Sequence, residues 1–212
     1  SMTWLQVVKQ HRAIAVIRAS ERQLGYQMAM AVVSGGMEII EITWNSAEAG
    51  SLIAQLRLEL PHCWIGTGTI LNMHHLKDAI ATGAQFLFAP HVDPNMITYA
   101  QSLGIPMIPG ALTPTEIVTA WNMGASCVKV FPIMTVGGAN YINYLQGPLR
   151  EIPLIPTGGV DLDNAREFIQ AGAIAVGLGG QLFPQTCIRS RNWPSISNMA
   201  RKLINRLEDT RK

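Results

Sequence analysis

The sequence predicts an α/β fold of one domain, a (β/α)8 TIM barrel that spans residues 1–212. Eight short apolar runs alternate along the chain with segments of helical spacing, which is the order of a repeated βα unit. The runs are apolar throughout, as parallel strands are when helices cover them. The chain is short for such a barrel, so we expect no second domain.

The predicted strands are apolar runs bounded by Gly, Pro or Asn. In chain order they cover Ala13–Arg18, Met37–Thr43, Trp64–Ile70, Phe86–His91, Pro106–Leu112, Cys127–Ile133, Leu154–Gly159 and Ala173–Gly180. The fifth run contains two prolines and a glycine, which strands disfavour. An open doubly wound sheet therefore remains the alternative to the closed barrel.

The predicted helices lie between these runs and are rich in Ala, Leu, Gln and Glu. They cover Glu21–Val33, Ala47–Leu60, His74–Thr82, Pro94–Ser102, Pro114–Met123, Ala139–Leu145, Leu162–Ala171 and Pro194–Leu207. Thr113 before Pro114, with Glu116 three residues on, indicates a capping box at a helix start. We expect Asp161 to cap a later helix and Gly172 to end it.

Composition narrows the classes of partner. The net charge of +2 is too small to indicate a nucleic-acid or membrane surface, so a small molecule is the expected partner. Hydrophobic residues make up 48% of the chain, which favours an oligomer. No leader pattern or long apolar run occurs, so we expect a soluble cytoplasmic protein, and we interpret Ser1 as a tag remnant. Three widely spaced cysteines indicate reduced, mostly buried thiols.

Lys129 is the residue least expected in its position, because it lies inside an apolar strand. It shares a strand face with Cys127 and Phe131, so it points into the barrel if they do. Burial there disfavours the ammonium form and favours a nucleophilic amine. The alternative is a lysine whose amine reaches solvent or pairs with an acid.

Three further polar residues lie near strand ends, where barrel enzymes keep their chemistry. Glu41 could move protons as a general acid and base, or could form a structural ion pair. Arg18 suits a carboxylate or phosphate by its planar donors, although an ordinary surface arginine is the simpler explanation. Thr69 could equally be a residue that favours strands.

Two glycine pairs follow the last two predicted strands, Gly158 with Gly159 and Gly179 with Gly180. Loops in these positions often bind phosphate in barrels, though glycine also serves tight turns. The histidines lack metal-ligand spacing, so we expect no metal. There is also no serine-hydrolase elbow.

Five motifs in order resemble those of the 2-keto-3-deoxy-6-phosphogluconate (KDPG) and 4-hydroxy-2-oxoglutarate (KHG) aldolase family. They are Ile40-Glu41-Ile42-Thr43, Gly66-Thr67-Gly68-Thr69, Pro109-Gly110, Val128-Lys129-Val130-Phe131-Pro132 and Pro156-Thr157-Gly158-Gly159. The resemblance covers about Ala13 to Gly180. It implies a class I (Schiff-base) aldolase of carbohydrate metabolism that has no metal or cofactor and forms a homotrimer.

The resemblance also implies roles for individual residues. Lys129 would form the imine with the keto carbon, and Glu41 would move protons. Arg18 and Thr69 would hold the pyruvate carboxylate, and Thr157 would contact the substrate. The phosphate would bind at Gly158, Gly159, Gly179 and Gly180.

Two positions depart from the family pattern. Asn45 stands where some relatives have an arginine, and Gly180 where phosphate-binding relatives have a serine. The expected reaction is cleavage of KDPG to pyruvate and glyceraldehyde 3-phosphate, or of KHG to pyruvate and glyoxylate. The alternatives are a pyruvate aldolase for another 2-keto-3-deoxy sugar acid, a phosphosugar isomerase or epimerase on the same barrel, and a binding protein without catalysis.

Overall fold

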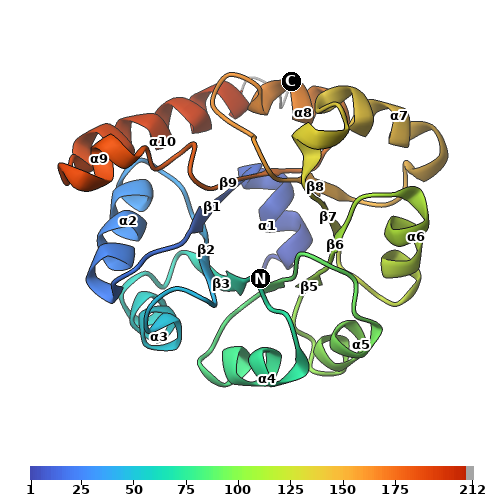
Figure 1. Ribbon diagram of the computed structural model, residues 1–212, viewed down its shortest axis with the longest axis horizontal. Coiled ribbons are helices and arrows are strands. Elements are labelled where there is room, and N and C mark those ends of the chain that lie inside the picture. Colours follow the sequence, from blue (N-terminus) through green and yellow to red (C-terminus); the bar gives the residue numbers. More distant parts are fainter. Residues whose placement is uncertain (209–212) are drawn as a thin grey trace.

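The apolar runs form parallel strands around one axis with helices outside them, in a computed structural model that describes residues 1–208 (Figure 1). The strands are β1 (Ala13–Ile17), β2 (Ile39–Thr43), β3 (Trp64–Gly68), β4 (Leu87–Phe88), β5 (Met107–Ile108), β6 (Gly110–Ala111), β7 (Val128–Val130), β8 (Leu154–Pro156) and β9 (Val176–Leu178). Each lies within one of the eight predicted runs and is shorter than that run.

The strands form two parallel sheets that together close the ring. One sheet has the order β5-β4-β3-β2-β1-β9 and the other the order β6-β7-β8. β5 and β6 are two halves of the predicted fifth strand, interrupted at Pro109, which has no N–H to donate. The Pro109 carbonyl still accepts the Lys129 N–H at 2.9 Å, so this run bonds to β7.

The last gap, between β8 and β9, is crossed by a hydrogen bond of 3.0 Å from the Ile174 N–H to the Leu154 carbonyl. The predicted barrel is therefore confirmed, and the open doubly wound sheet is wrong.

The helices lie outside the strands, except one at an end of the barrel (Figure 1). They are α1 (Trp4–His11), α2 (Arg22–Ser34), α3 (Ala49–Glu59), α4 (Met73–Ala81), α5 (Pro94–Ser102), α6 (Pro114–Asn122), α7 (Ala139–Leu149), α8 (Ala165–Gln170), α9 (Gln185–Arg189) and α10 (Trp193–Glu208), with a 3-10 helix η1 (Ile133–Val136). Of these, α1, α9 and η1 are not predicted by the sequence pattern. None of the helices within residues 1–208 is long and apolar enough to cross a bilayer.

Helix ends agree with the sequence in one case and differ in another. The capping box of Thr113 and Glu116 is present at the start of α6. Asp161, by contrast, is not a helix cap, because α8 begins only at Ala165. The Asp161 carboxylate instead accepts the Asp163 and Asn164 N–H groups and closes a turn.

Alternation along the strands divides the apolar core into two parts. Outward side chains such as Ile40, Ile65 and Val128 pack in the layer between strands and helices. Inward side chains fill the amino-terminal half of the barrel with Ile14, Ile39, Phe86, Phe88, Ile108, Cys127, Ile155 and Ala175. Two of the three free cysteines, Cys63 and Cys127, are buried, as the sequence indicates.

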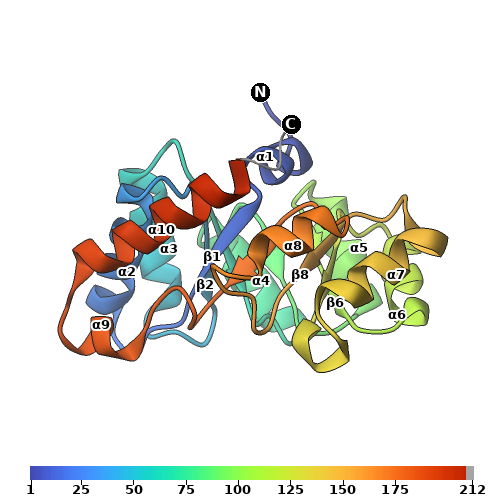
Figure 2. The same cartoon turned by 90° about the horizontal axis from the view of Figure 1, so that it is seen from above.

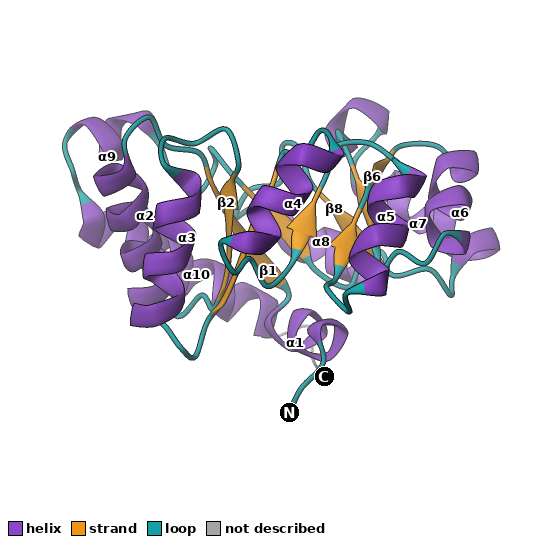
Figure 3. Ribbon diagram, turned by 90° about the horizontal axis from the view of Figure 1, so that it is seen from below, coloured by secondary structure: helices purple, strands orange, loops and turns teal. Residues whose placement is uncertain are grey.

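Helix α1 closes the amino-terminal end of the barrel (Figures 2 and 3). Its Trp4 ring stacks on Phe86 with centroids 4.4 Å apart and meets Phe88 edge-on at 6.4 Å. Large side chains thus fill the barrel interior at this end, whereas the cavity lined by the predicted site residues opens at the carboxyl ends of the strands.

Candidate active site

All nine predicted site residues line one cavity of about 340 Å³. They come from the carboxyl-terminal parts of six strands and the loops that follow: Arg18 after β1, Glu41 in β2, Thr69 after β3, Lys129 in β7, Thr157, Gly158 and Gly159 after β8, and Gly179 and Gly180 after β9. The barrel therefore brings together residues that lie far apart in the sequence, from Arg18 near its start to Gly180 near its end.

Lys129 points into this cavity from the middle of β7, with Cys127 buried below it. Burial lowers the pKa of the Lys129 amine, the Glu41 carboxylate raises it, and the Arg18 guanidinium lowers it. The amine nitrogen also lies 4.6 Å from the centroid of the Phe131 ring, on the mouth side. A neutral, nucleophilic amine is thus more accessible at Lys129 than at a surface lysine.

Glu41 is 4% exposed, and burial raises the pKa of its carboxyl, while the positive charges of Lys129 and Arg18 lower it. The neighbouring strand makes room for this side chain. A Cβ placed on Gly68 would stand 2.5 Å from a Glu41 carboxylate oxygen. A buried carboxyl beside an amine is suited to take up and return protons.

Arg18 and Thr69 follow their strands at the cavity rim. Arg18 is exposed, whereas Thr69 has a left-handed backbone with φ of 58°. Strand propensity does not account for Thr69, because it lies beyond β3 in a conformation that β-branched residues rarely adopt. Asn45 does not line this cavity, and Arg18 is the one arginine among the described residues that do.

Thr157 faces the cavity with a hydroxyl that has no protein partner within residues 1–208, although the residue is only 8% exposed. A buried hydroxyl without a partner is costly unless a ligand or water satisfies it. Gly177 again leaves space, since a Cβ there would stand 2.5 Å from the Thr157 methyl carbon.

The glycine pair after β8 lines the cavity. Gly158 and Gly159 both have positive φ, at 95° and 88°, which favours glycine. Their carbonyls accept hydrogen bonds from the Met134 N–H and the Asn164 side chain. Within residues 1–208 their own N–H groups donate to no protein acceptor, so they are available to an anion.

Several lining residues were not predicted as site residues: Val16, Thr43, Pro90, Phe131, Val160, Gly177 and Gln181. Strand alternation could have found Val16, Thr43 and Gly177, each two positions from a predicted residue. Pro90, Val160 and Gln181 belong to loops, whose course the local sequence does not specify.

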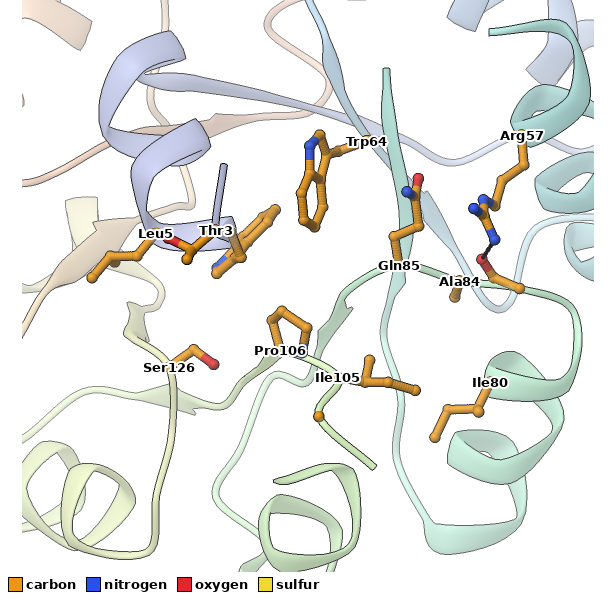
Figure 4. Close-up of a pocket in the computed structure, with 13 residues that line it drawn as sticks. Thr3, Leu5, Arg57, Trp64, Ile80, Ala84, Gln85, Ile105, Pro106 and Ser126 are labelled. Carbon is orange, nitrogen blue, oxygen red and sulfur yellow. Dashed lines mark hydrogen bonds between the residues drawn. The ribbon is translucent and has the colours of Figure 1, made fainter. Parts of the chain in front are cut away.

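A larger cavity, of about 830 Å³, lies at the opposite end of the barrel beside α1 (Figure 4). Apolar side chains such as Trp64, Ile105 and Pro106 make up much of its wall, and the Arg57 guanidinium donates to the Gly83 carbonyl at 3.1 Å. Among the described residues, no carboxylate or lysine lines it. The carboxylate and the lysine described above line the cavity at the carboxyl-terminal face instead.

Comparison with known proteins shows the family to which this chain belongs. The family model described as KDPG and KHG aldolase matches residues 5–199. The chain is 30% identical over 201 residues to the 2-dehydro-3-deoxy-phosphogluconate aldolase of Haemophilus influenzae, covering 95% of both chains. It is 28% identical over 191 residues to the KHG/KDPG aldolase of Escherichia coli, covering 90% of both.

Among solved structures, the KDPG aldolase of Legionella pneumophila superposes with a TM-score of 0.87 at 26% identity, covering 95% of this chain and 98% of that one. That crystal holds pyruvate captured as a covalent carbinolamine intermediate.

Proposed function

Because the chain belongs to the KDPG and KHG aldolase family, a family of class I lyases, we propose that it cleaves KDPG to pyruvate and glyceraldehyde 3-phosphate, or KHG to pyruvate and glyoxylate. The observation that carries this proposal is the pair of Lys129 and Glu41, a half-buried lysine whose pKa burial lowers and a buried carboxyl in one cavity. An isomerase or epimerase would not need such a nucleophile.

In the proposed mechanism the Lys129 amine attacks the keto carbon, and loss of water leaves an iminium. Glu41 takes the proton of the C4 hydroxyl, the C3–C4 bond breaks, and its electrons move to the iminium nitrogen. The C4 oxygen becomes the aldehyde carbonyl and an enamine of pyruvate remains. Protonation at C3 and hydrolysis then release pyruvate and restore the amine.

The other residues hold the ends of the substrate. Arg18 suits the carboxylate of the pyruvate half by its planar donors, and the strained Thr69 lies on the same rim. The Thr157 hydroxyl is free to bond to a substrate oxygen. The unpaired amides of Gly158 and Gly159 suit a phosphate, with Gly179 and Gly180 on the facing loop.

Modification of one lysine tests the central step. Pyruvate with borohydride should reduce the imine and label Lys129 alone, because burial makes its amine nucleophilic. Lys129→Ala should abolish both the label and turnover. Lys77→Ala is the matched control, since Lys77 also lies over an aromatic ring, Tyr99, but outside the cavity. Labelling that persists in Lys129→Ala would disprove the mechanism.

Substrate preference should depend on position 180. A Cβ at Gly180 meets nothing within 4 Å, so Gly180→Ser fits without strain and adds a donor near the phosphate loop. A hydrogen bond to a charged group contributes about 1.5–3 kcal/mol, so the ratio of kcat/KM for KDPG to that for KHG should rise roughly ten- to a hundredfold. An unchanged ratio would show that position 180 does not set this preference.

Assembly and location form part of the same proposal. We expect a cytoplasmic homotrimer that works without a metal or cofactor. Partly exposed apolar residues near the cavity mouth, among them Leu71, Phe131 and Met134, favour association. Sedimentation equilibrium should give three times the chain mass of 23.1 kDa. A monomeric mass at micromolar concentration would contradict the trimer.

A further inference from the structure

A second cavity, which we call the side cavity, opens next to the catalytic one. Its volume is about 710 Å³, within the range of about 300–1,000 Å³ that is usual for small-molecule sites. Val16, Arg18, Gly179 and Gly180 line both cavities. The two spaces are therefore neighbours with a common wall, and three members of that wall, Arg18, Gly179 and Gly180, are proposed substrate-binding residues.

The common wall leaves the two cavities in open connection, because two of its four residues, Gly179 and Gly180, have no side chain. A Cβ at Gly179 would have no neighbour nearer than 3.9 Å, and a Cβ at Gly180 would have none within 4 Å. The loop after β9 thus leaves open space beside the backbone on the route from one cavity to the other. A group attached to the reacting aldehyde carbon has room to extend across it.

The far end of the side cavity is apolar. Leu24 and Met28 lie one turn apart on α2, and Phe183 and Ile188 face them from the loop after β9 and from α9. Met28 and Phe183 are each 4% exposed, whereas Leu24 and Ile188 are half-buried and leave apolar surface facing the cavity. This end offers a surface that gains from contact with hydrocarbon.

The rim of the side cavity is polar but neutral, with Ser20, Asn45 and Gln185. Arg18, at the common wall, is the one charged residue among those that line it within residues 1–208. In the proposed mechanism Arg18 already holds the pyruvate carboxylate. The side cavity therefore supplies no cation for a phosphate, in contrast to the amides of Gly158 and Gly159.

We infer that the side cavity binds an apolar, uncharged substituent of the aldehyde partner, so that the enzyme also joins pyruvate to aliphatic aldehydes. This inference rests on the proposed function, because it uses the pyruvate enamine on Lys129. Carbon C3 of the enamine attacks the aldehyde carbon, and the new C–C bond leaves an alkoxide. The oxygen takes the proton that Glu41 removed from the pyruvate methyl group, and hydrolysis releases a 4-hydroxy-2-keto acid.

A homologous series of aldehydes measures how strongly kcat/KM depends on the length of the aldehyde's hydrocarbon chain. With pyruvate in excess, kcat/KM is determined for acetaldehyde, propanal, butanal and pentanal. Each added methylene that enters the apolar end should raise kcat/KM about fourfold, the equivalent of burying one CH2 group. A flat or falling series in the native protein would overturn the inference.

Filling the side cavity should remove the dependence of kcat/KM on aldehyde chain length. Ile188→Trp should flatten the series, because the larger ring occupies the apolar end. Ile204→Trp is the matched control, since Ile204 is also half-buried but lies on α10 away from both cavities. Ser20→Trp narrows the exposed rim and tests the same space if Ile188→Trp does not fold, with Ser51→Trp on α3 as its control.

Borohydride trapping of pyruvate on Lys129 in every variant separates the side cavity assignment from the proposed function. If native protein is not labelled, the proposed function fails. If labelling is normal and the series rises equally in the native protein, Ile188→Trp and Ser20→Trp, only the side cavity assignment fails. Normal labelling with a rising series in the native protein and both controls, and a flat series in the two filled variants, is the expected result.

Discussion

At the scale of single residues, the site depends on three charges that influence one another. Burial alone lowers the pKa of Lys129 and raises that of Glu41, so each group is driven toward its neutral form. Their mutual attraction opposes both shifts. Arg18 favours the ionised form of Glu41 and the neutral form of Lys129. A neutral lysine beside an ionised carboxylate is the state that imine formation requires.

Removing the charge of Glu41 or that of Arg18 should shift the pH midpoint of imine formation in opposite directions. The amine must lose its proton to attack, so imine formation speeds up as pH rises through the Lys129 pKa. Glu41→Gln removes the charge that raises this pKa and should move the midpoint to lower pH. Arg18→Met removes a charge that lowers it and should move the midpoint to higher pH.

The measurement is the single-turnover rate of imine formation with pyruvate across pH. Glu41→Gln should also slow the reaction, because a positioned general base contributes about 10²- to 10⁴-fold. The midpoint and not the amplitude is therefore compared. Midpoints that move in the same direction in both variants would show that these charges do not act on Lys129 as described.

At the scale of the elements, inward-facing glycines make room for the reactive side chains. β3 contributes Gly66 and Gly68 to the barrel interior where its neighbours contribute bulky groups. A Cβ at Gly66 would stand 2.5 Å from the Phe86 ring, and a Cβ at Gly68 would stand 2.5 Å from a Glu41 carboxylate oxygen. In β3, Gly66 thus makes room for the Phe86 ring in the core, and Gly68, nearer the carboxyl end of the strand, makes room for the Glu41 carboxyl group.

Gly68→Ala should therefore damage catalysis more than folding. The new methyl group meets the end of a flexible side chain, so Glu41 can move aside at small cost to stability. Displacing a catalytic group by about 1 Å can cost roughly 10²-fold in rate. Gly147→Ala is the control, since a methyl group there meets nothing within 4 Å. Native turnover in Gly68→Ala, measured with thermal unfolding of both variants, would contradict this role of Gly68.

At the scale of the whole molecule, the two ends of the barrel have different tasks. The amino-terminal end is filled by large side chains and closed by α1, whereas the carboxyl-terminal end remains open for chemistry. This division allows mutations at one end to change stability without touching the reacting groups.

Trp4→Ala should lower stability while leaving the reacting groups at the other end of the barrel intact. Trp4 is 4% exposed and packs against Phe86, Phe88 and Trp64. Its removal should cost about 3–5 kcal/mol of unfolding free energy, as for other buried aromatic residues. Denaturant unfolding measures this loss, and borohydride trapping below the transition should still label Lys129. A loss below about 1 kcal/mol would mean that α1 does not hold the barrel closed.

The sequence alone determined the order of strands and helices, and it placed Lys129 on one strand face with Cys127 and Phe131. Apolar runs and strand alternation are local properties, and they are sufficient for both. They also placed Glu41 and Arg18 at strand ends, where a barrel would bring them together. They did not reveal α9, which has only five residues, or α1, although Trp4, Val7 and Val8 have helical spacing.

Only the tertiary structure decided whether the ring closes, how Gly68 and Gly177 clear space for Glu41 and Thr157, and that a side cavity adjoins the catalytic one. Closure depends on a hydrogen bond between Ile174 and Leu154, and the clearances depend on contacts between different strands. Such contacts join residues far apart in the chain. The spacing of residues along the chain does not predict these contacts, because their free energy arises only when the strands pack together.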